Sequence, residues 1–160
     1  MNNVTIIAAI GKNKELGKNN DLIWHLKEDM LFFKENTTGK IIVMGINTFN
    51  SLPKLLPNRV HIVLTHQDIN IDNVYICHNM YDLLSFIKSV NKEVMIIGGA
   101  SIYKLFIDYA NKMLLTEINK EEKDADTYFP SFDENNWNKT IIKEVEENNI
   151  NYKHVRYLRK

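Results

Sequence analysis

The chain has 160 residues, 44% of them hydrophobic and 25% charged, which is the composition of an ordinary globular protein. Its 20 Lys and Arg residues balance 20 Asp and Glu residues, so no net charge attracts nucleic acid or an anionic membrane. The single cysteine, Cys77, cannot form an internal disulfide, and we favour a packed thiol over a reactive one. We therefore predict one cytoplasmic domain over residues 1–160.

The first elements are a buried strand and a polar loop. Residues 4–10 are almost continuously apolar, as in a central strand covered on both faces, and the run is far too short to span a membrane. Residues 11–21 are polar and contain a glycine, which indicates a loop that could act as a lid.

Residues 25–35 predict a helix that carries an acid on its apolar face. Leu26, Met30 and Phe33 have the i, i+4, i+7 spacing of a buried stripe. Asp29 lies three residues after Leu26 and four before Phe33, so its carboxylate points along that stripe. Burial would raise its pKa unless a partner meets it. Alternatively, Asp29 faces water and simply complements the helix dipole in the first turn.

The rest of the chain alternates strands with helices. We predict strands at residues 41–45, 60–65, 74–77, 93–97 and 112–118, helices at 47–52, 80–90 and 101–106, and a closing hairpin of strands 140–146 and 152–159. Asn79 and Asp82 resemble a capping box at the start of the second of these helices, and Ser101 could cap the third. The order predicts an α/β fold with a mainly parallel central sheet, flanking helices and an antiparallel C-terminal hairpin.

Ligands of parallel sheets bind beyond the carboxyl ends of the strands, and small or polar residues gather there. These residues are Ala8, Ala9, Gly45–Thr48, Thr65, His66, Gly98–Ser101 and Thr116. Gly98 and Gly99 would let the backbone approach a pyrophosphate at a helix start, and Gly45 with Thr48 repeats the arrangement. A tight turn is the alternative explanation of the glycine pair, but two such sites in one sheet favour a dinucleotide.

Other polar residues are less specific. Arg59 offers a bidentate fork to a carboxylate or phosphate, or is an ordinary surface arginine. His66 and His78 could meet a phosphate or simply be exposed. The five histidines and the lone cysteine lack the spacing of metal ligands, and no nucleophile–base pair supports covalent hydrolysis.

Over essentially its whole length the sequence resembles the dihydrofolate reductases. The matching motifs occur in order: IIAAIG, LIWHLKEDMLFFK, VMGINTFNSLPKLLPNR, HIVLTHQ, MIIGGASIY, MLLTEI and ADTYFP. The resemblance implies a dihydrofolate reductase-like domain that transfers a hydride from NADPH to 7,8-dihydrofolate. The product, 5,6,7,8-tetrahydrofolate, would support one-carbon metabolism and thymidylate synthesis. It also implies diaminopyrimidine and pteridine antifolates as ligands, and a monomer.

The resemblance gives roles to the substrate site. Asp29 would pair with the amino-pyrimidine edge of the pterin, joined by Thr116, while a water near Leu22, ordered by Trp24, delivers a proton to N5. Arg59 would hold the glutamate α-carboxylate. The walls around the pterin and benzoyl groups would be Ile7, Ala8, Met30, Phe33, Leu52, Leu56 and Ile97, with Tyr103 beside them.

The same resemblance places the cofactor along the strand ends. Ala9, Leu16, Gly17 and Tyr103 would lie by the nicotinamide. The pyrophosphate would meet Gly45, Asn47, Thr48, Gly98, Gly99, Ala100, Ser101 and Ile102, and the adenosine half would meet Leu64, Thr65, His66 and His78. In the family the peptide between the paired glycines is cis.

Three positions depart from the family pattern. Ile23 stands where proline is common, and Ile46 and Ser101 replace groups that often help to hold the adenosine phosphate. We therefore expect NADPH without excluding NADH. Two rival functions are a riboflavin-pathway pyrimidine reductase of the same fold and a catalytically silent nucleotide- or folate-binding module.

Overall fold

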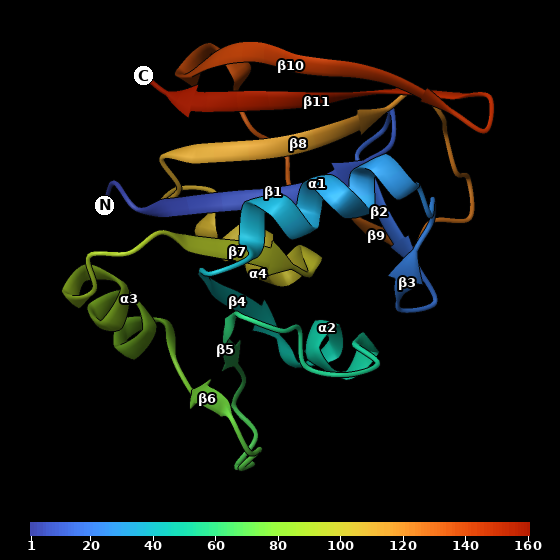
Figure 1. The fold of residues 1–160 in the computed structure, drawn as a ribbon. Coiled ribbons are helices and arrows are strands. Elements are labelled where there is room, and N and C mark those ends of the chain that lie inside the picture. The colour runs from blue at the N-terminus through green and yellow to red at the C-terminus, as the bar shows by residue number, and fades with distance from the viewer.

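The computed structural model describes residues 1–160 and contains one large sheet (Figure 1). Its strands lie in the order β10-β11-β8-β1-β7-β4-β5-β6. Their bounds are β1 Val4–Ile10, β4 Ile41–Gly45, β5 Val60–Leu64, β6 Val74–Cys77, β7 Val94–Gly98, β8 Lys112–Ile118, β10 Trp137–Glu147 and β11 Ile150–Arg159. Neighbouring strands are parallel except for the two pairs that involve β11. The predicted mainly parallel α/β sheet with an antiparallel hairpin is confirmed, and the antiparallel strand lies inside the sheet.

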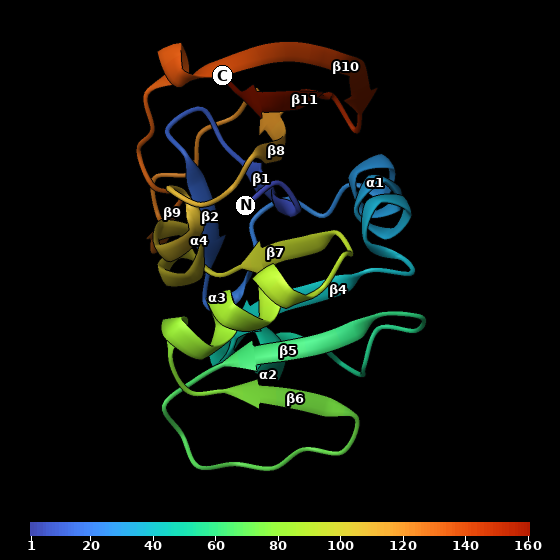
Figure 2. The same ribbon diagram turned by 90° about the vertical axis from the view of Figure 1, so that its left-hand side faces the viewer.

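Helices cover both faces of this sheet, as Figure 2 shows for α1 and α4 on opposite sides. The helices are α1 Lys27–Thr37, α2 Ile46–Ser51, α3 Met80–Ser89 and α4 Ala100–Phe106, with a 3-10 turn at Glu134–Asn136. Phe32 and Phe33 of α1 pack on one face of the sheet, and Ile87 of α3 and Phe106 of α4 pack on the other. None of the helices combines the length and apolar character that crossing a bilayer requires.

Helix α1 differs from its prediction. It begins at Lys27, and Leu26 is the buried residue before it. Met30, expected in the buried stripe, is 57% exposed. The shielded residues are instead Asp29, Phe32, Phe33, Asn36 and Thr37, an i, i+3, i+4, i+7, i+8 series. Asp29 therefore starts the face that rests on the sheet, and of the predicted stripe only Met30 was wrong, since Leu26 is buried and Phe33 packs on the sheet.

The segment predicted as a polar loop contains strand structure. Strand β2, Glu15–Lys18, lies between β3, Asp21–Leu22, and β9, Thr127–Tyr128, in a separate small sheet. Glu15 is buried, and its carboxylate accepts hydrogen bonds from the backbone N–H groups of Asn13 at 2.7 Å and Glu122 at 2.6 Å. The strands β2 and β3 escaped prediction because they are short and polar, and because β9, the other partner of β2, is more than 100 residues away.

The helix caps gave one correct and one wrong prediction. Asn79 Oδ1 accepts from the backbone N–H of Asp82 at 2.8 Å, which confirms the cap of α3. Ser101 does not cap α4, because that helix begins one residue earlier and Gly99 occupies the N-cap position.

The β10–β11 hairpin turns through Asn148 and Asn149, whose φ angles are 53° and 62°. Positive φ at both central residues defines the turn type that matches the twist of paired strands, and asparagine tolerates it better than most residues.

We expect Asn149→Ala to lower the free energy of unfolding by about 1 kcal/mol, since alanine resists the left-handed conformation, whereas Asn149→Gly should cost nothing. Urea denaturation measures both. Asn151→Ala, an exposed position inside β11, is the matched control. Equal stability of the Asn149→Ala and Asn151→Ala variants would contradict the assigned turn.

Candidate active site

The predicted residues converge because the parallel strands end at the same edge. Ala9 of β1 lies opposite Thr116 of β8, and Thr116 lies opposite His154 of β11. Three neighbouring strands thus present side chains at one level of the sheet, next to the start of α1, which carries Asp29.

Asp29 meets the sheet through a short hydrogen bond. Thr116 Oγ1 donates to Asp29 Oδ1 at 2.5 Å, and only 15% of the Asp29 side chain remains exposed. Burial raises the pKa of Asp29 above its ordinary value of 3.8; the Thr116 bond opposes this shift and the charge of Glu147 adds to it. The alternative of a solvated surface acid is therefore wrong for Asp29.

Sequence reasoning missed the group that caps α1. Leu26, at the N-cap position, offers no side-chain acceptor. Glu147, at the end of β10, accepts from the backbone N–H groups of Lys27 at 2.7 Å and Glu28 at 3.1 Å, and from the hydroxyl of Tyr152 at 2.9 Å. The bonds from the backbone N–H groups of Glu28 and Lys27 lower the pKa of Glu147. No local pattern could reveal this cap, because it comes from 120 residues away.

A second missed residue is His154. Its Nδ1 lies 2.9 Å from Thr116 Oγ1 and 3.8 Å from Asp29 Oδ1. The only sequence signal would have been the register of β11 against β8, which the sequence alone does not give.

The predicted apolar walls are partly assembled. Phe33, Leu52, Leu56 and Ile97 pack with Ile7 on the α1 face of the sheet. Met30 is exposed, and Ala8 packs in the cluster on the opposite face, so its side chain points away from Asp29. Alternation along β1 explains the difference, because Ile7 and Ala9 share a face that Ala8 does not.

The two residues expected to position the proton-donating water lie just before α1. Leu22 of β3 is 49% exposed. Trp24 is half-buried and packs so closely over Gly11 that a Cβ there would come within 2.7 Å of the indole Cη2. Gly11 is thus required for the position of Trp24.

Arg59 lies in the loop before β5 without an acidic partner. Its Nη2 donates to Thr38 Oγ1 at 3.0 Å, while its Nε is buried and has no hydrogen-bond acceptor. Burial lowers the pKa of Arg59. His61 anchors this loop: its Nε2 accepts from the backbone N–H of Leu56 at 3.0 Å, so Nδ1 carries the proton and faces the carbonyl oxygen of Arg59 at 3.3 Å.

The glycine turns form a cradle between two helix starts. The Gly98–Gly99 peptide is cis, as the resemblance implied. Gly45 and Gly99 are the N-cap residues of α2 and α4, and no side chain caps either helix. A Cβ at Gly45 would come within 3.0 Å of Ile102, and one at Gly99 within 3.4 Å of Thr48 Oγ1. Uncapped N–H groups and small residues suit anionic oxygens.

The remaining predicted cofactor residues flank this cradle. Tyr103 is buried, and its hydroxyl donates to the carbonyl oxygen of Ile7 at 2.7 Å; burial raises its pKa. His78 Nδ1 lies 2.9 Å from the carbonyl oxygen of Thr65, whereas His66 is exposed and makes no hydrogen bond. Leu16 and Gly17 lie on β2, Leu64 ends β5, and Asn47, Ala100 and Ser101 lie in the first turns of α2 and α4.

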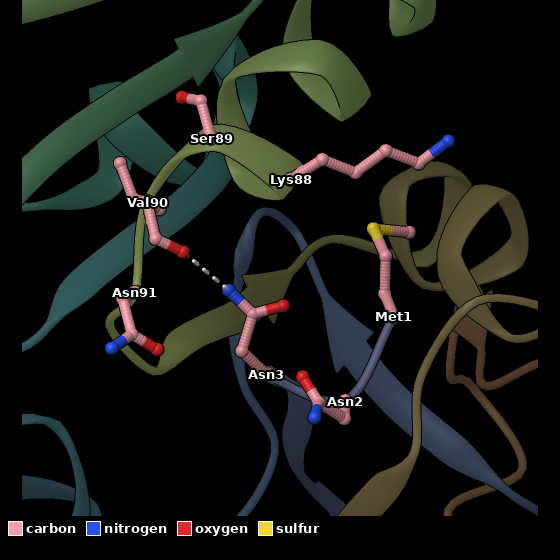
Figure 3. A pocket seen from close by; sticks show the side chains of 7 residues that line it. All are labelled: Met1, Asn2, Asn3, Lys88, Ser89, Val90 and Asn91. Carbon is pink, nitrogen blue, oxygen red and sulfur yellow. Dashed lines mark hydrogen bonds between the residues drawn. The ribbon is translucent and has the colours of Figure 1, made fainter.

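A hollow of about 430 Å³ lies at the opposite end of the sheet, lined by Met1–Asn3 and Lys88–Asn91 (Figure 3). The amide of Asn3 donates there to the carbonyl oxygen of Val90 at 3.3 Å, so this side chain ties the start of β1 to the end of α3. No group of three or more His, Cys, Asp or Glu side chains is placed to hold a metal ion.

The chain matches the model of the dihydrofolate reductase family over residues 3–159. It belongs to that family. The dihydrofolate reductase of Bacillus subtilis (strain 168) is 37% identical, covering 98% of this chain and 95% of the relative. That of Haemophilus influenzae is 36% identical, covering 83% and 82%. A solved dihydrofolate reductase from Enterococcus faecalis, complexed with NADP(H) and RAB-propyl, has a TM-score of 0.90 at 29% identity and covers 98% of this chain and 96% of its own.

Dihydrofolate reductase membership confirms the predicted fold and reaction. The chain is an oxidoreductase that reduces dihydrofolate with NADPH, and neither the pyrimidine reductase nor the silent binding module is favoured.

The buried carboxylate should lower stability near neutral pH. Because the pKa of Asp29 is raised on folding, the folded state binds more protons between 3.8 and that raised pKa, and stability falls as pH rises through this window. Asp29→Asn should therefore have a higher Tm than the unaltered protein at pH 7, with the difference vanishing below the window.

Thermal unfolding followed by circular dichroism at several pH values measures this effect. Glu35→Gln, an exposed acid on the same helix, is the control and should leave the pH profile unchanged. A lower Tm for Asp29→Asn at pH 7 would show that the carboxylate stabilises the fold.

Proposed function

We propose that this chain reduces 7,8-dihydrofolate at a site built around Asp29. The observation that carries the proposal is the shielded carboxylate held by Thr116 at 2.5 Å, where the β1 and β8 strands meet the first turn of α1. A carboxylate in such a place needs a donor partner, because burial raises its pKa and the hydrogen bond from Thr116 only opposes that shift.

The amino-pyrimidine edge of the pterin would be that partner. Thr116 bonds to Oδ1, and no protein group bonds to Oδ2 of Asp29. A planar pair of N–H donors matches a carboxylate in two parallel hydrogen bonds. Diaminopyrimidine antifolates present a similar donor edge, so the same carboxylate would bind them.

Asp29 would bind the pyrimidine side of the pterin ring. Another group must therefore supply the proton to N5. Leu22 is half exposed, and Trp24, two residues later, packs against Gly11. We assign these residues to the passage and ordering of a water that delivers the proton. NADPH, when bound, supplies the hydride that completes the reduction.

Arg59 would bind the α-carboxylate of the glutamate tail. Its guanidinium makes no ion pair within the chain, and its Nε is buried without an acceptor. An unpaired, partly desolvated cation gains most from a carboxylate that accepts from both of its edges. Phe33, Leu52 and Leu56 would line the path between the two charges.

The glycine cradle would hold the cofactor pyrophosphate. Thr48, Asn47 and the first turn of α4 supply hydroxyl, amide and backbone N–H donors there. Ala9, Leu16, Gly17 and Tyr103 would border the nicotinamide, and Leu64, Thr65, His66 and His78 the adenosine half.

Cofactor preference would depend on few groups. Ile46 packs against the sheet and Ser101 is exposed, so neither position supplies a cation to a phosphate on the adenosine ribose. We propose NADPH as the preferred cofactor, with His66 as the first candidate to contact that phosphate. We also propose a single cytoplasmic domain that works as a monomer without nucleic acid partners. The balanced charge supports the last of these points.

Replacing the carboxylate tests the proposed site. Asp29→Asn should lower kcat/KM for dihydrofolate at pH 7 by at least about 100-fold, since the amide cannot pair as an anion with the pterin. The assay follows the loss of reduced-nicotinamide absorbance with NADPH and NADH in parallel. Glu35→Gln is the matched control. Unaltered turnover by Asp29→Asn would remove Asp29 from the site.

Arg59→Leu tests the carboxylate clamp. It should weaken binding of folate by roughly 10- to 100-fold, the loss expected for a charge-assisted bidentate contact, and leave a small pterin without glutamate unaffected. Fluorescence titration gives both Kd values. Arg156→Leu, an exposed arginine on β11, is the control. Equal losses for both ligands would mean that Arg59 acts on the pocket as a whole.

A further inference from the structure

His154 is a buried ionisable group that the proposed mechanism does not use. Only 3% of its side chain is exposed. The ring stacks on Phe32 with centroids 3.9 Å apart and an interplanar angle of 9°, and it meets the edge of Tyr152 at 5.6 Å. Its Nε2 is buried with no hydrogen-bond partner. Only Nδ1 makes a hydrogen bond, and its partner is the hydroxyl of Thr116 at 2.9 Å.

The direction of the hydrogen bonds follows from counting protons. Thr116 Oγ1 carries one proton, and an ionised Asp29 can only accept, so at 2.5 Å that proton points to Asp29 Oδ1. The hydroxyl oxygen can then only accept from His154, so Nδ1 must carry the ring proton. The opposite tautomer would place an N–H at Nε2, where nothing accepts it.

The surroundings of His154 keep its ring neutral. Burial lowers its pKa, the charge of Lys143 on β10 lowers it further, and Glu28 on α1 opposes the shift. Asp29 faces it from α1 at 3.8 Å, and Tyr152 faces it from β11. The groups around Asp29 itself are Thr116, His154, Glu147, Tyr103 and Tyr152.

We propose that His154 is a positioning residue for Asp29: its Nδ1–H fixes the Thr116 hydroxyl as a donor to Asp29 and so favours the ionised carboxylate that binds substrate. The inference rests on the role proposed above for Asp29. The register of β8 and β11 supplies the geometry, because Thr116 and His154 are directly opposed. Without the N–H donor, the Thr116 hydroxyl is free to rotate, and the protonated form of Asp29 gains relative to the ionised form.

Two substitutions separate the donor from the ring. His154→Phe keeps an aromatic ring to stack on Phe32 and removes the donor, whereas His154→Asn removes the ring and places an amide N–H near the position of Nδ1. The pH dependence of kcat/KM with NADPH and dihydrofolate and the titration of the Asp29 carboxyl by carbon-13 NMR are compared among the unaltered protein and both variants.

His154→Phe should shift the acid limb of the activity profile and the Asp29 titration upward together, by about one pH unit. His154→Asn should stay close to the unaltered protein. A shift in His154→Asn with none in His154→Phe would assign the effect to ring packing and overturn the proposal. If the Asp29 titration shifts and the activity profile does not, then His154 does act on Asp29, but the proposed role of Asp29 in the reaction is wrong.

Nitrogen-15 NMR of the unaltered protein gives a test that needs no variant to fold. Near pH 7, His154 should show a protonated Nδ1 and an unprotonated Nε2. A ring protonated at Nε2, or at both nitrogens, would overturn the proposal irrespective of activity.

Discussion

The hydrogen bond between Thr116 and Asp29 joins the two parts of the molecule on which the site depends. Asp29 belongs to a helix near the start of the chain, and Thr116 to a strand near the middle of the sheet. A buried carboxylate is tolerated only where donors meet it, so this contact fixes both the orientation of α1 and the charge at the end of β8. Glu147 secures the start of the same helix by accepting hydrogen bonds from its first free N–H groups.

The candidate site contains several polar groups that the protein itself leaves without hydrogen-bond partners. Asp29 has one protein donor and an unused oxygen, Arg59 has an unpaired Nε, and the first turns of α2 and α4 lack side-chain caps. Each of these groups costs stability in the free protein, and in the proposed function each would meet a different charged or polar part of dihydrofolate or NADPH. Binding energy would then be available at three separated points and would fix the orientation of both ligands.

Much of the fold could be predicted from local sequence. The apolar runs of β1, β4 and β8 gave strands within a residue of those observed, because parallel strands buried on both faces need such runs. The short polar strands of the small sheet gave no periodic signal. Met30 was misplaced because spacing alone does not show which of two overlapping helical stripes faces the sheet.

The site residues also divide into those that local sequence reveals and those that it does not. Asp29 and the glycine turns are visible in sequence because each carries a local signature, and the family resemblance adds Thr116 and Arg59. Glu147 and His154 were invisible because their roles depend on pairing between segments about 120 and 38 residues apart. The register of β11 against β8, rather than any motif, decides that a histidine contacts Thr116.

The position of β11 also bears on the order in which the enzyme can be made. This strand follows every other strand in sequence, yet it lies between β8 and β10 in the sheet. A ribosome releases α1 and the strands from β1 to β8 well before residues 150–159 emerge. Until then β8 has an open edge, and Thr116 lacks His154. The nascent chain therefore cannot complete a competent site, and its exposed strand edge is the point at which chaperone protection during synthesis is most needed.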